Sequence, residues 1–500
     1  MPITHIAIVG GGTAGWMAAA AFSKALPKTE FKITLIETPE IPTVGVGEAT
    51  IPPIEAFNKL LGINKYELLK ATQGTFKLGI EFLNWGKLGD SYYHPFGVYG
   101  TYFDNVPFHQ SWKRARSHQK ASELEAYSLN TLAARQAKFI EAQKVKNSPL
   151  ATIHHAYHFD ARLYAKYLRH YSEKMGVVRI EGKVNKVSLD SSNGFISQLH
   201  LDGGDVINAD FFIDCTGFQG LLIEKALNTG YDDWSAYLPC NSAIAIPSQK
   251  SYPTPSHTKA IAHGFGWQWR IPLQHRVGNG FVYSNNFCSD AAAEKTLLSN
   301  LETEPLATPI QLRFTTGQRK KMWNKNCLAL GLASGFLEPL ESTSIHLIQS
   351  AISKFLGVFP NASSFEHEAT RFNKLMNQEM LSIRDFLILH YKATQRDDTE
   401  FWNYCRNMPI PDSLHEKIDL YLSSAHLYKD HHELFSENSW LSVFEGQGIT
   451  SNAYSSLAKQ SSITVLAERI HKIGSIVKQC ADAMPSHDEY IHKHCKAEKI

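Results

Sequence analysis

Several features that would place the chain in a specialised class of protein are scarce. The 500 residues include seven cysteines, which are scattered, odd in number and without a C-x-x-C pair, and this usage fits a reducing cytosol best. No run of the sequence approaches the roughly twenty apolar residues that a membrane-spanning helix needs. We therefore expect a cytoplasmic protein without a membrane-spanning segment.

An excess of charge of one sign is also lacking. The 50 lysines and arginines nearly balance the 48 aspartates and glutamates, and the formal net charge of +2 leaves no electrostatic footprint for nucleic acid or an anionic membrane. The apolar start at 6–22 holds four glycines and follows no basic region, so a signal peptide is not indicated. The 43% apolar share is enough for a substantial core in one large domain or in two or three closely packed ones.

The strongest local pattern that is present lies near the N-terminus. A short buried-strand pattern at 5–9 leads into a G-x-G-x-x-G motif that starts at Gly10 and opens an alanine-rich helix predicted at 16–26. A pyrophosphate could bind the N-terminal amides of that helix. A second strand at 31–36 ends at Glu37, where a carboxylate can hold a ribose hydroxyl. Together these features predict a dinucleotide-binding unit, and a glycine-rich turn without a ligand is the alternative.

The rest of the chain alternates between helical and strand patterns. In chain order we expect a glycine- and proline-rich loop at 41–53, short helices at 54–72, a dense apolar segment at 75–86, an aromatic loop at 88–125, helices at about 122–145 and at 160–174, short strands at 178–207, a buried strand at 209–217, mostly strands at 230–315 and predominantly helices at 364–500. The strand at 209–217 would return the chain to the nucleotide-binding sheet. These patterns predict an α/β protein.

One strand carries an unusual amount of aromatic surface. In the segment 266–272, Trp267, Trp269 and Ile271 would project from one face, and Pro272 would end the strand. Paired tryptophans on a strand usually belong to the core. The alternative is a wall that divides the space on its two sides.

Lys77 is the single lysine in the apolar segment 75–86. A lysine among such neighbours is usually a surface residue whose aliphatic part lies along apolar surface. A minority of such lysines are desolvated and functional. The sequence alone favours the surface position.

Three further stretches hold candidate binding residues. The loop at 88–125 is rich in aromatic residues, which suits either a pocket for a flat apolar ligand or packing beneath the loop. Ser342 or Thr343 can cap the helix that follows, and the amides of its first turn could receive an anion. The tail holds His487, His492, His494 and Cys495, for which a frayed polar terminus is favoured over a metal site, so no metal is expected.

Four motifs, taken in their order and spacing, resemble the flavin-dependent tryptophan halogenases. They are Gly10-x-Gly12-x-x-Gly15, Lys77, Trp267-x-Trp269-x-Ile271-Pro272 and Glu338-Pro339-Leu340-Glu341-Ser342-Thr343. Stretches at 157–161, 214–222 and 396–402 look similar as well, and the likeness runs from residue 4 to about 448. The tryptophan motif together with the lysine makes the resemblance specific, because related flavin hydroxylases carry the glycines without either.

The resemblance implies a Rossmann-like FAD-binding domain of the flavin monooxygenase type, with a β-rich insertion and a mainly helical C-terminal substrate region. The FAD-binding domain would span 1–360, with substrate-side insertions at about 88–150 and 230–315, and the region 361–500 would close the substrate pocket. The residues implied in FAD binding are Gly10, Gly12, Thr13, Ala14, Gly15, Glu37, Val46, Glu48, Val187, Leu332 and Ile345.

The resemblance also implies a reaction. Reduced flavin, oxygen and a halide, chloride or bromide, would give hypohalous acid. Lys77 would bind that acid or become a haloamine and pass the halogen to an aromatic ring, while Glu341 would hold the lysine and accept the proton that the ring loses. The residues implied elsewhere are Thr343 and Ser344 for halide, Trp267, Trp269, Ile271 and Pro272 for a barrier between flavin and substrate, and His94, Phe96, Ser342, Trp440 and Phe444 for substrate.

The chain departs from the family pattern at two places. Better-known members have glycine where Ser344 stands, and a serine there would be strained only if the position needs a positive φ. The segment that holds the amino acid in tryptophan-specific members is shortened here to 438–448. We therefore expect indole or another uncharged aromatic compound to be preferred over free tryptophan.

Two other functions fit some of the same residues. An aromatic monooxygenase would hydroxylate its substrate without halide, and a non-catalytic flavin-binding protein would turn nothing over. The tryptophan motif argues against the first, and Lys77 with Glu341 argues against the second. A single dinucleotide motif leaves no evident place for NADH, so a separate NAD(P)H-dependent flavin reductase is the expected partner, and a homodimer is compatible with the sequence.

Overall fold

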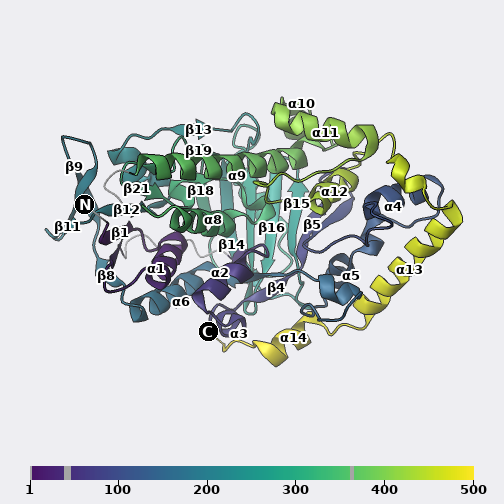
Figure 1. Cartoon of the computed structure of the whole chain (residues 1–500), viewed down its shortest axis with the longest axis horizontal. Coiled ribbons are helices and arrows are strands. Elements are labelled where there is room, and N and C mark those ends of the chain that lie inside the picture. Colours follow the sequence, from purple (N-terminus) through teal and green to yellow (C-terminus); the bar gives the residue numbers. More distant parts are fainter. Residues whose placement is uncertain (1–2, 39–46, 361–364, 500) are drawn as a thin grey trace. The chain divides into compact units, whose positions relative to one another are not determined.

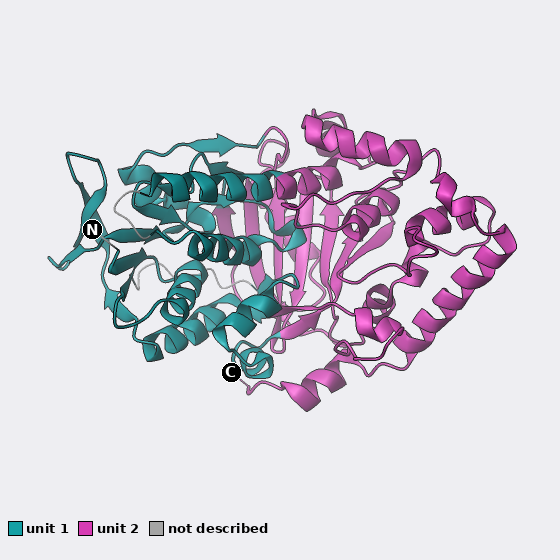
Figure 2. Ribbon diagram, viewed as in Figure 1, with its two compact units in different colours: residues 1–74, 159–235, 313–381 teal, residues 75–158, 236–312, 382–500 magenta. Residues whose placement is uncertain are grey.

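Six stretches of the chain fall alternately into two units in the computed structural model, which describes residues 3–38, 47–360 and 365–499. Unit 1 holds 1–74, 159–235 and 313–381, and unit 2 holds 75–158, 236–312 and 382–500 (Figure 2). Each unit therefore combines segments that are far apart in the sequence. The helices and strands of both are labelled in Figure 1.

Unit 1 is built on a six-stranded, mostly parallel sheet. Its strand order is β20 (Trp323–Asn324), β21 (Cys327–Ala329), β12 (Phe211–Asp214), β1 (His5–Val9), β2 (Lys32–Glu37) and β8 (Val178–Glu181), and only the edge pair of β20 with β21 is antiparallel. The central strands are almost wholly apolar, as expected where a parallel sheet is covered on both faces. The predicted return of the chain to the nucleotide-binding sheet is confirmed by the pairing of β12 with β1.

Helices of unit 1 pack close to this sheet. They are α1 (Thr13–Ala25), α2 (Ile54–Leu61), α3 (Lys65–Ala71), α6 (Ala161–Lys174) and α8 (Ser344–Gly357), and α9 (Glu366–Lys392) starts in the same unit. The alanine-rich α1 buries the stretch from Gly15 to Ser23, because small side chains allow it to lie close to α6 and α8. The short helices predicted at 54–72 and the helix predicted at 160–174 are confirmed.

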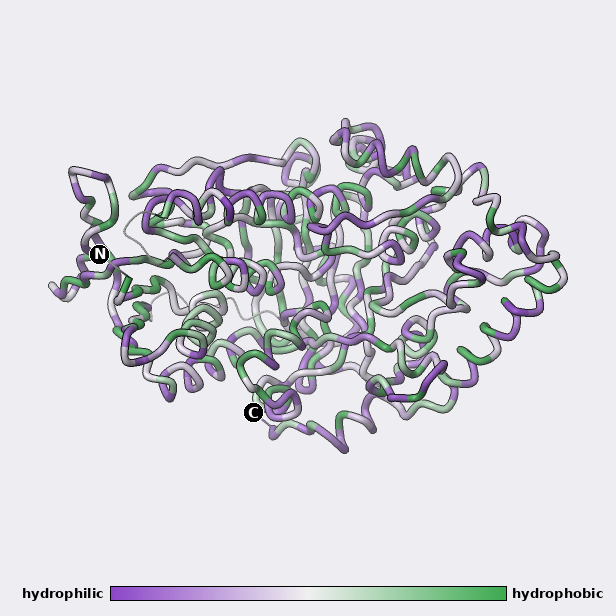
Figure 3. The backbone as a smooth tube through the Cα atoms, viewed as in Figure 1, coloured by the Kyte–Doolittle hydropathy of each residue, from purple (hydrophilic) through white to green (hydrophobic). Residues whose placement is uncertain are grey.

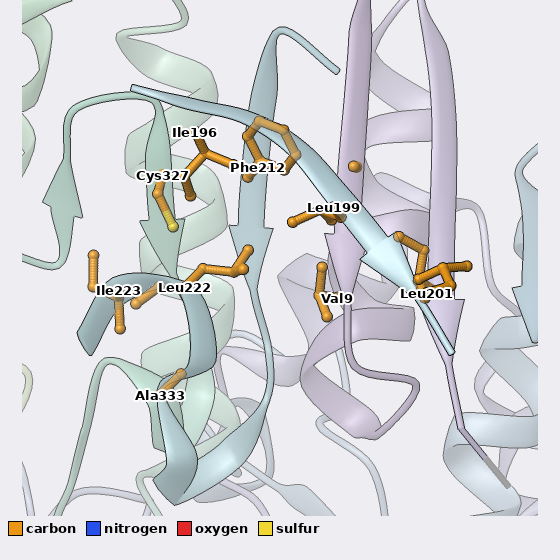
Figure 4. Close-up of a cluster of buried hydrophobic side chains, with 12 residues drawn as sticks. Val9, Ile196, Leu199, Leu201, Phe212, Leu222, Ile223, Cys327 and Ala333 are labelled. Atoms are coloured by element: carbon orange, nitrogen blue, oxygen red, sulfur yellow. The ribbon is translucent and has the colours of Figure 1, made fainter. Parts of the chain in front are cut away.

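A second, smaller sheet completes the core of unit 1. It contains β9 (Val184–Leu189), β10 (Ile196–Leu201) and β11 (Val206–Asn208), and a further small sheet contains β13 (Tyr231–Asp233), β19 (Gly317–Arg319) and β22 (Gly335–Phe336). Leu199 and Leu201 of β10 lie in one hydrophobic cluster with Val9 and Phe212 of the large sheet (Figure 4). This cluster fixes the strand that precedes the glycine motif.

Unit 2 is built on a seven-stranded sheet. Its order is β18 (Ile310–Arg313), β14 (Ser242–Gln249), β17 (Arg276–Tyr283), β16 (Gly266–Pro272), β15 (Thr258–His263), β5 (Gly79–Leu83) and β6 (Ser91–Pro95). The pair β15 and β5 is parallel, whereas β14 with β17, β17 with β16, β16 with β15 and β5 with β6 are antiparallel. The β-rich character predicted for 230–315 is confirmed, although it also contains the helix α7 (Asp290–Ser299).

The C-terminal part is helical, as predicted. Its helices are α10 (Glu400–Asn407), α11 (Asp412–Ser424), α12 (Glu437–Gly446), α13 (Ile463–Asp482) and α14 (His487–His494). Along α13 hydrophobic and hydrophilic residues alternate (Figure 3), and its buried residues Leu466, Ile470, Val477 and Ala481 recur at helical spacing. No helix among the described residues is long and apolar enough to cross a membrane.

Two of the local predictions for unit 2 were wrong. The stretch 88–125 is not a continuous loop, because β6 and the helix α4 (Phe108–Ser117) lie in it. The helix predicted at 122–145 is reduced to a 3-10 turn, η1 (Leu124–Tyr127), and the short helix α5 (Leu129–Arg135). Both errors arise where aromatic and apolar residues pack against neighbouring elements instead of marking one long amphipathic face.

Candidate functional site

The glycines of the N-terminal motif are placed where side chains cannot fit, with one exception. Gly10 has φ = 114°, and a Cβ added to it would lie 2.2 Å from the carbonyl oxygen of Cys215. A Cβ on Gly15 would lie 1.9 Å from the carbonyl oxygen of Gly10. A Cβ on Gly12 would meet no atom of the described residues within 4 Å. The open space over Gly12 is therefore available to a ligand that approaches the backbone.

The helix α1 starts at this open space. Gly12 is its N-cap residue and has no side chain to cap the first amides. The first turn, which begins with Thr13 and Ala14, holds no acidic residue. The first amides of a helix lack intrahelical partners and attract anions. This arrangement fits the pyrophosphate of a dinucleotide. Gly331, next to Leu332, also lies here, because a Cβ on Gly331 would be 2.9 Å from the Cβ of Ala14.

Leu332 lies on the 3-10 turn η5 (Gly331–Ala333) and is 39% exposed. An exposed leucine next to the start of α1 could cover part of a flat ligand. Leu332 thus directly follows Gly331, the residue that lies against Ala14.

Glu37 ends β2 as predicted, but it is surrounded by partners that the sequence did not reveal. Its carboxylate forms ion pairs with Arg179 and, at 3.5 Å, with Arg169. The indole nitrogen of Trp16 donates a hydrogen bond to it at 3.3 Å. A ribose hydroxyl would therefore have to share this carboxylate with two guanidinium groups.

The other predicted cofactor residues are spread over unit 1. Val46 lies outside the described residues. Glu48 lies on β3 (Gly47–Ala49), and burial raises the pKa of its carboxyl group to about 7. Val187 lies on β9 and packs against the cluster of Figure 4, so its contact with a flavin stays a prediction.

The start of α8 provides a second set of amides. Thr343 occupies the N-cap position, and Ser344 is the first helical residue, followed by the buried Ile345. Ser344 has no positive φ, so serine is not strained there. The positive φ of 59° belongs instead to Ser342, which is buried at the end of the turn η6 (Pro339–Glu341). The backbone amide of Ser344 is therefore unaffected by the exchange of glycine for serine.

Thr343, one of the two residues predicted to cap α8, does not cap it with its hydroxyl group. Thr343 makes no side-chain cap hydrogen bond, and its buried Oγ1 has no hydrogen-bond partner among the described residues. A buried hydroxyl without a partner is costly. A hydroxyl beside the first-turn amides of a helix suits a small anion.

Two carboxyl groups precede this helix. Glu338 and Glu341 are both fully buried. Fully buried glutamates are rare in proteins and are associated with functional sites. Ser342, which was predicted to contact substrate, lies in the same turn of unit 1.

Lys77 is fully buried in unit 2, so the predicted surface position is wrong. It ends the short strand β4 (Thr75–Lys77), which pairs antiparallel with β7 (Ala156–Asp160) and places Lys77 opposite Ala156. Its Nζ lies 5.1 Å from the ring centroid of Phe96, within the range of a cation–π interaction. Two residues that were predicted for different roles, one catalytic and one substrate-binding, are thus in contact.

A directed hydrogen-bond chain joins the lysine strand to the tryptophan strand. The Oγ1 of Thr75 donates to the carbonyl oxygen of Pro272 at 2.7 Å, so its contact of 2.9 Å with Nδ1 of His158 requires the ring nitrogen to donate. Nε2 of His158 must then accept from Oγ1 of Thr258, at 2.9 Å. Burial and the charge of Lys77 hold the pKa of His158 well below its ordinary value, which agrees with this neutral form.

The tryptophan strand is β16, and the predicted shared face is confirmed. The rings of Trp267 and Trp269 lie 6.1 Å apart, and Trp85 lies 6.3 Å from Trp267. Trp269 fills the space over Gly280 of β17, where an added Cβ would lie 1.9 Å from its ring. Ile271 and Pro272 are also buried. The wall is therefore part of the sheet core of unit 2.

The other predicted substrate residues belong to an aromatic cluster. His94 packs against Phe386 and Phe435, at centroid distances of 5.7 and 6.0 Å, and Trp440 packs against Phe386 at 5.0 Å. Phe444 lies 6.0 Å from the ring of Trp440 and is stacked on Tyr421 at 4.4 Å. Trp440 is buried, and its Nε1 has no hydrogen-bond partner among the described residues.

The charged groups next to this cluster are buried or half-buried and pair with one another. Lys417 lies 4.8 Å from the ring of Trp440 and forms an ion pair with Glu433 at 2.7 Å. Lys113 pairs with Glu445 at 2.6 Å. A charged ligand would have to compete with these pairs.

Sequence reasoning missed the arginines around Glu37 and the hydrogen bonds of His158. Arg179 lies near Glu37 because β8 pairs with β2 in parallel, with Arg179 opposite Leu35. This register would have indicated the ion pair, but it can be derived only once the order of the strands in the sheet is known. His158 stood in a motif that was noted only for its likeness. Among the described residues, no three histidine, cysteine, aspartate or glutamate side chains are placed to hold a metal ion.

Comparisons with known proteins find similar sequences and similar structures. A family model described as tryptophan halogenase matches residues 5–462. The tryptophan 7-halogenase RebH of Lentzea aerocolonigenes is 34% identical, with 98% of each chain covered. Two solved structures are similar: Xcc4156, a flavin-dependent halogenase from Xanthomonas campestris (43% identity, TM-score 0.97, 100% of both chains), and BrvH, a flavin-dependent halogenase from Brevundimonas sp. BAL3 (39% identity, TM-score 0.94, 98% of this chain and 99% of the other).

The open space over Gly12 leads to a first prediction. Gly12 has extended backbone angles, φ = −76° and ψ = −172°, so valine fits there without strain in the protein. Gly12→Val should keep the fold but abolish FAD binding, because the side chain fills the approach to the amides. The control is Gly203→Val, which also adds a side chain where no atom lies within 4 Å. Normal FAD affinity in a folded Gly12→Val protein would refute the assignment.

Proposed function

Because this chain belongs to the tryptophan halogenase family, we propose that it uses FADH2, oxygen and a halide to place a halogen on an indole-like aromatic compound. The observation that carries the proposal is the complete burial of Lys77 against the ring of Phe96. A buried ammonium group is costly for the fold and is retained where it has a task. Hydroxylation by a flavin enzyme has no need for such an amine.

Unit 1 supplies a cradle that fits FAD. The amides of Thr13 and Ala14 at the start of α1 would hold the pyrophosphate, and Glu37 would bind a ribose hydroxyl. When bound, reduced flavin would supply two electrons to oxygen, and the halide would supply the other two as it is oxidised to hypohalous acid, with the second oxygen atom leaving as water. The amides at Thr343 and Ser344 are proposed to hold the halide. The buried hydroxyl of Thr343, which has no hydrogen-bond partner in the part of the chain that the structure describes, supports this.

Lys77 is proposed to act on the hypohalous acid. Its ammonium group would hydrogen-bond to the oxygen and polarise it while the halogen passes to a ring carbon, or its amine would carry the halogen as a haloamine. A fixed charge is more effective where water is excluded, as it is around this fully buried side chain. The fully buried carboxylate of Glu341 is proposed to take the proton that the ring loses.

The remaining roles complete the proposal. Trp267, Trp269, Ile271 and Pro272 would keep substrate from the flavin, and their burial in one sheet supports a rigid wall. Reduced flavin would come from a separate NAD(P)H-dependent reductase in the cytoplasm, and a homodimer is compatible with the proposal.

The division of labour between lysine and flavin can be tested. Lys77→Ala should lower aromatic halogenation by about a hundredfold or more, the effect of removing one preorganised electrostatic donor. Oxidation of reduced flavin should continue at the parent rate, because the amine acts after the flavin step. Lys77→Met serves as a control for lost volume beside Phe96. Halogenation by either variant at the parent rate would exclude a catalytic role for Lys77.

The paired charges beside the aromatic cluster lead to a prediction about substrate. Burying an unpaired ammonium or carboxylate costs several kcal/mol, so kcat/KM should be at least about tenfold higher for indole than for tryptophan. The measurement should use one flavin supply and saturating bromide. Skatole, tryptamine and indole-3-propionate separate the effects of the ring substituent, the ammonium and the carboxylate. A preference for tryptophan would contradict the prediction and show that its charged end is bound.

A further inference from the structure

The last helix of the chain is an ordered part of unit 2, contrary to the predicted frayed terminus. The family model ends at residue 462, before this helix. At the start of α14, the Ser486 side chain accepts a hydrogen bond from the backbone N–H of Glu489, and the Glu489 side chain accepts one from the backbone N–H of Ser486. His487 is fully buried. One of the tail histidines thus has a defined position.

His487 is hydrogen-bonded at both ring nitrogens. Nε2 accepts the backbone N–H of Phe76 at 3.1 Å, and Nδ1 donates to the carbonyl oxygen of Thr254 at 3.1 Å. Only the neutral ring with its proton on Nδ1 can make both bonds. Burial lowers the pKa of His487 to about 4, so this form is dominant at neutral pH.

Phe76 precedes Lys77 on β4. Its backbone N–H points away from β7 and would be an unsatisfied group without the ring of His487. Two backbone N–H groups point away from β7, those of Phe76 and of Leu78, the residue after β4. The N–H of Leu78 donates to the carbonyl oxygen of Ser256 at 2.7 Å. Buried backbone N–H groups need partners. His487 and Ser256 therefore hold the backbone immediately before and after Lys77.

The ring of Phe76 anchors the same strand. It stacks on Phe139 at 4.1 Å and meets the ring of Tyr490 of α14 edge-on at 5.4 Å. Successive side chains of a strand point to opposite faces, so with Phe76 held among these rings Lys77 is turned the other way, where it meets Phe96.

We propose that His487 is a positioning residue for halogen transfer: by accepting the N–H of Phe76, it fixes the strand that aims Lys77 at the substrate. The proposal rests on the catalytic role proposed for Lys77. It concerns the transfer to substrate and leaves the oxidation of reduced flavin unchanged.

Two substitutions separate the two hydrogen bonds of the ring. His487→Gln keeps an acceptor near the position of Nε2 and loses the donor at Nδ1. His487→Asn keeps a donor near Nδ1 and loses the acceptor for Phe76. We expect the Asn variant to halogenate indole about ten- to a hundredfold more slowly, as for a catalytic group displaced by about 1 Å, and the Gln variant to stay within a few-fold of the parent.

Three readouts are measured for each full-length variant: halogenated indole per reduced flavin consumed, the rate of reduced-flavin oxidation, and hydrogen exchange of the Phe76 amide. The proposal predicts that only the Asn variant loses exchange protection and product yield, with the oxidation rate unchanged. Equal yields in both variants, or lost protection with full yield, would overturn it. An overall loss of stability would instead lower all functions together.

A further variant decides the matter if His487→Asn does not fold. Tyr490→Leu removes the ring that meets Phe76 edge-on and keeps both hydrogen bonds of His487. Because the bond from the Phe76 N–H is kept, the proposal predicts a protected Phe76 amide and a product yield per flavin within a few-fold of the parent. A large loss of yield with that amide still protected would show that ring packing, and not the hydrogen bond, aims Lys77, and would contradict the proposal. Lys77→Ala is measured in parallel to separate failure of the proposed function from failure of this proposal. If Lys77→Ala halogenates normally, the catalytic role of Lys77 is wrong. If Lys77→Ala is inactive while the His487 variants halogenate normally, the role of His487 is wrong.

Discussion

The buried charge of Lys77 is the constraint on which much of unit 2 depends. An ammonium group without water is unfavourable by several kcal/mol unless its surroundings compensate. The ring of Phe96 presents its face to the charge at 5.1 Å, and His158 nearby is held neutral by its own burial and by that charge. A protonated His158 would place a second cation in the same core. The neutral ring instead becomes a donor and an acceptor in a fixed order.

That order has a structural consequence. The chain of hydrogen bonds from Thr258 through His158 and Thr75 reaches the carbonyl oxygen of Pro272, the last residue of the tryptophan strand. The lysine strand and the tryptophan strand are thus fixed to one another within unit 2. This rigidity suits a reaction in which the lysine must stay at one place beside a wall that does not move.

The sequence predicted correctly those features whose signal lies within a short stretch of the chain. The glycine motif, its flanking strands and the acid at Glu37 depend on neighbours within a few dozen residues, and all were placed correctly. The burial of Lys77 depends on strands from distant parts of the chain, so local composition favoured the surface. The tail with His487 was wrongly predicted to be frayed for the same reason, because the partner of His487, Phe76, lies 411 residues away. The effect of Ser344 needed the backbone angle, which placed the positive φ at Ser342.

The central claim is that the chain halogenates an aromatic ring, and the product itself tests it most directly. The protein would be incubated with FAD, a flavin reductase, NADH, oxygen and indole, with and without bromide, and the product read by mass spectrometry. Our account predicts a monobrominated indole that forms only with bromide. Hydroxylated indole formed equally with and without bromide would contradict the account.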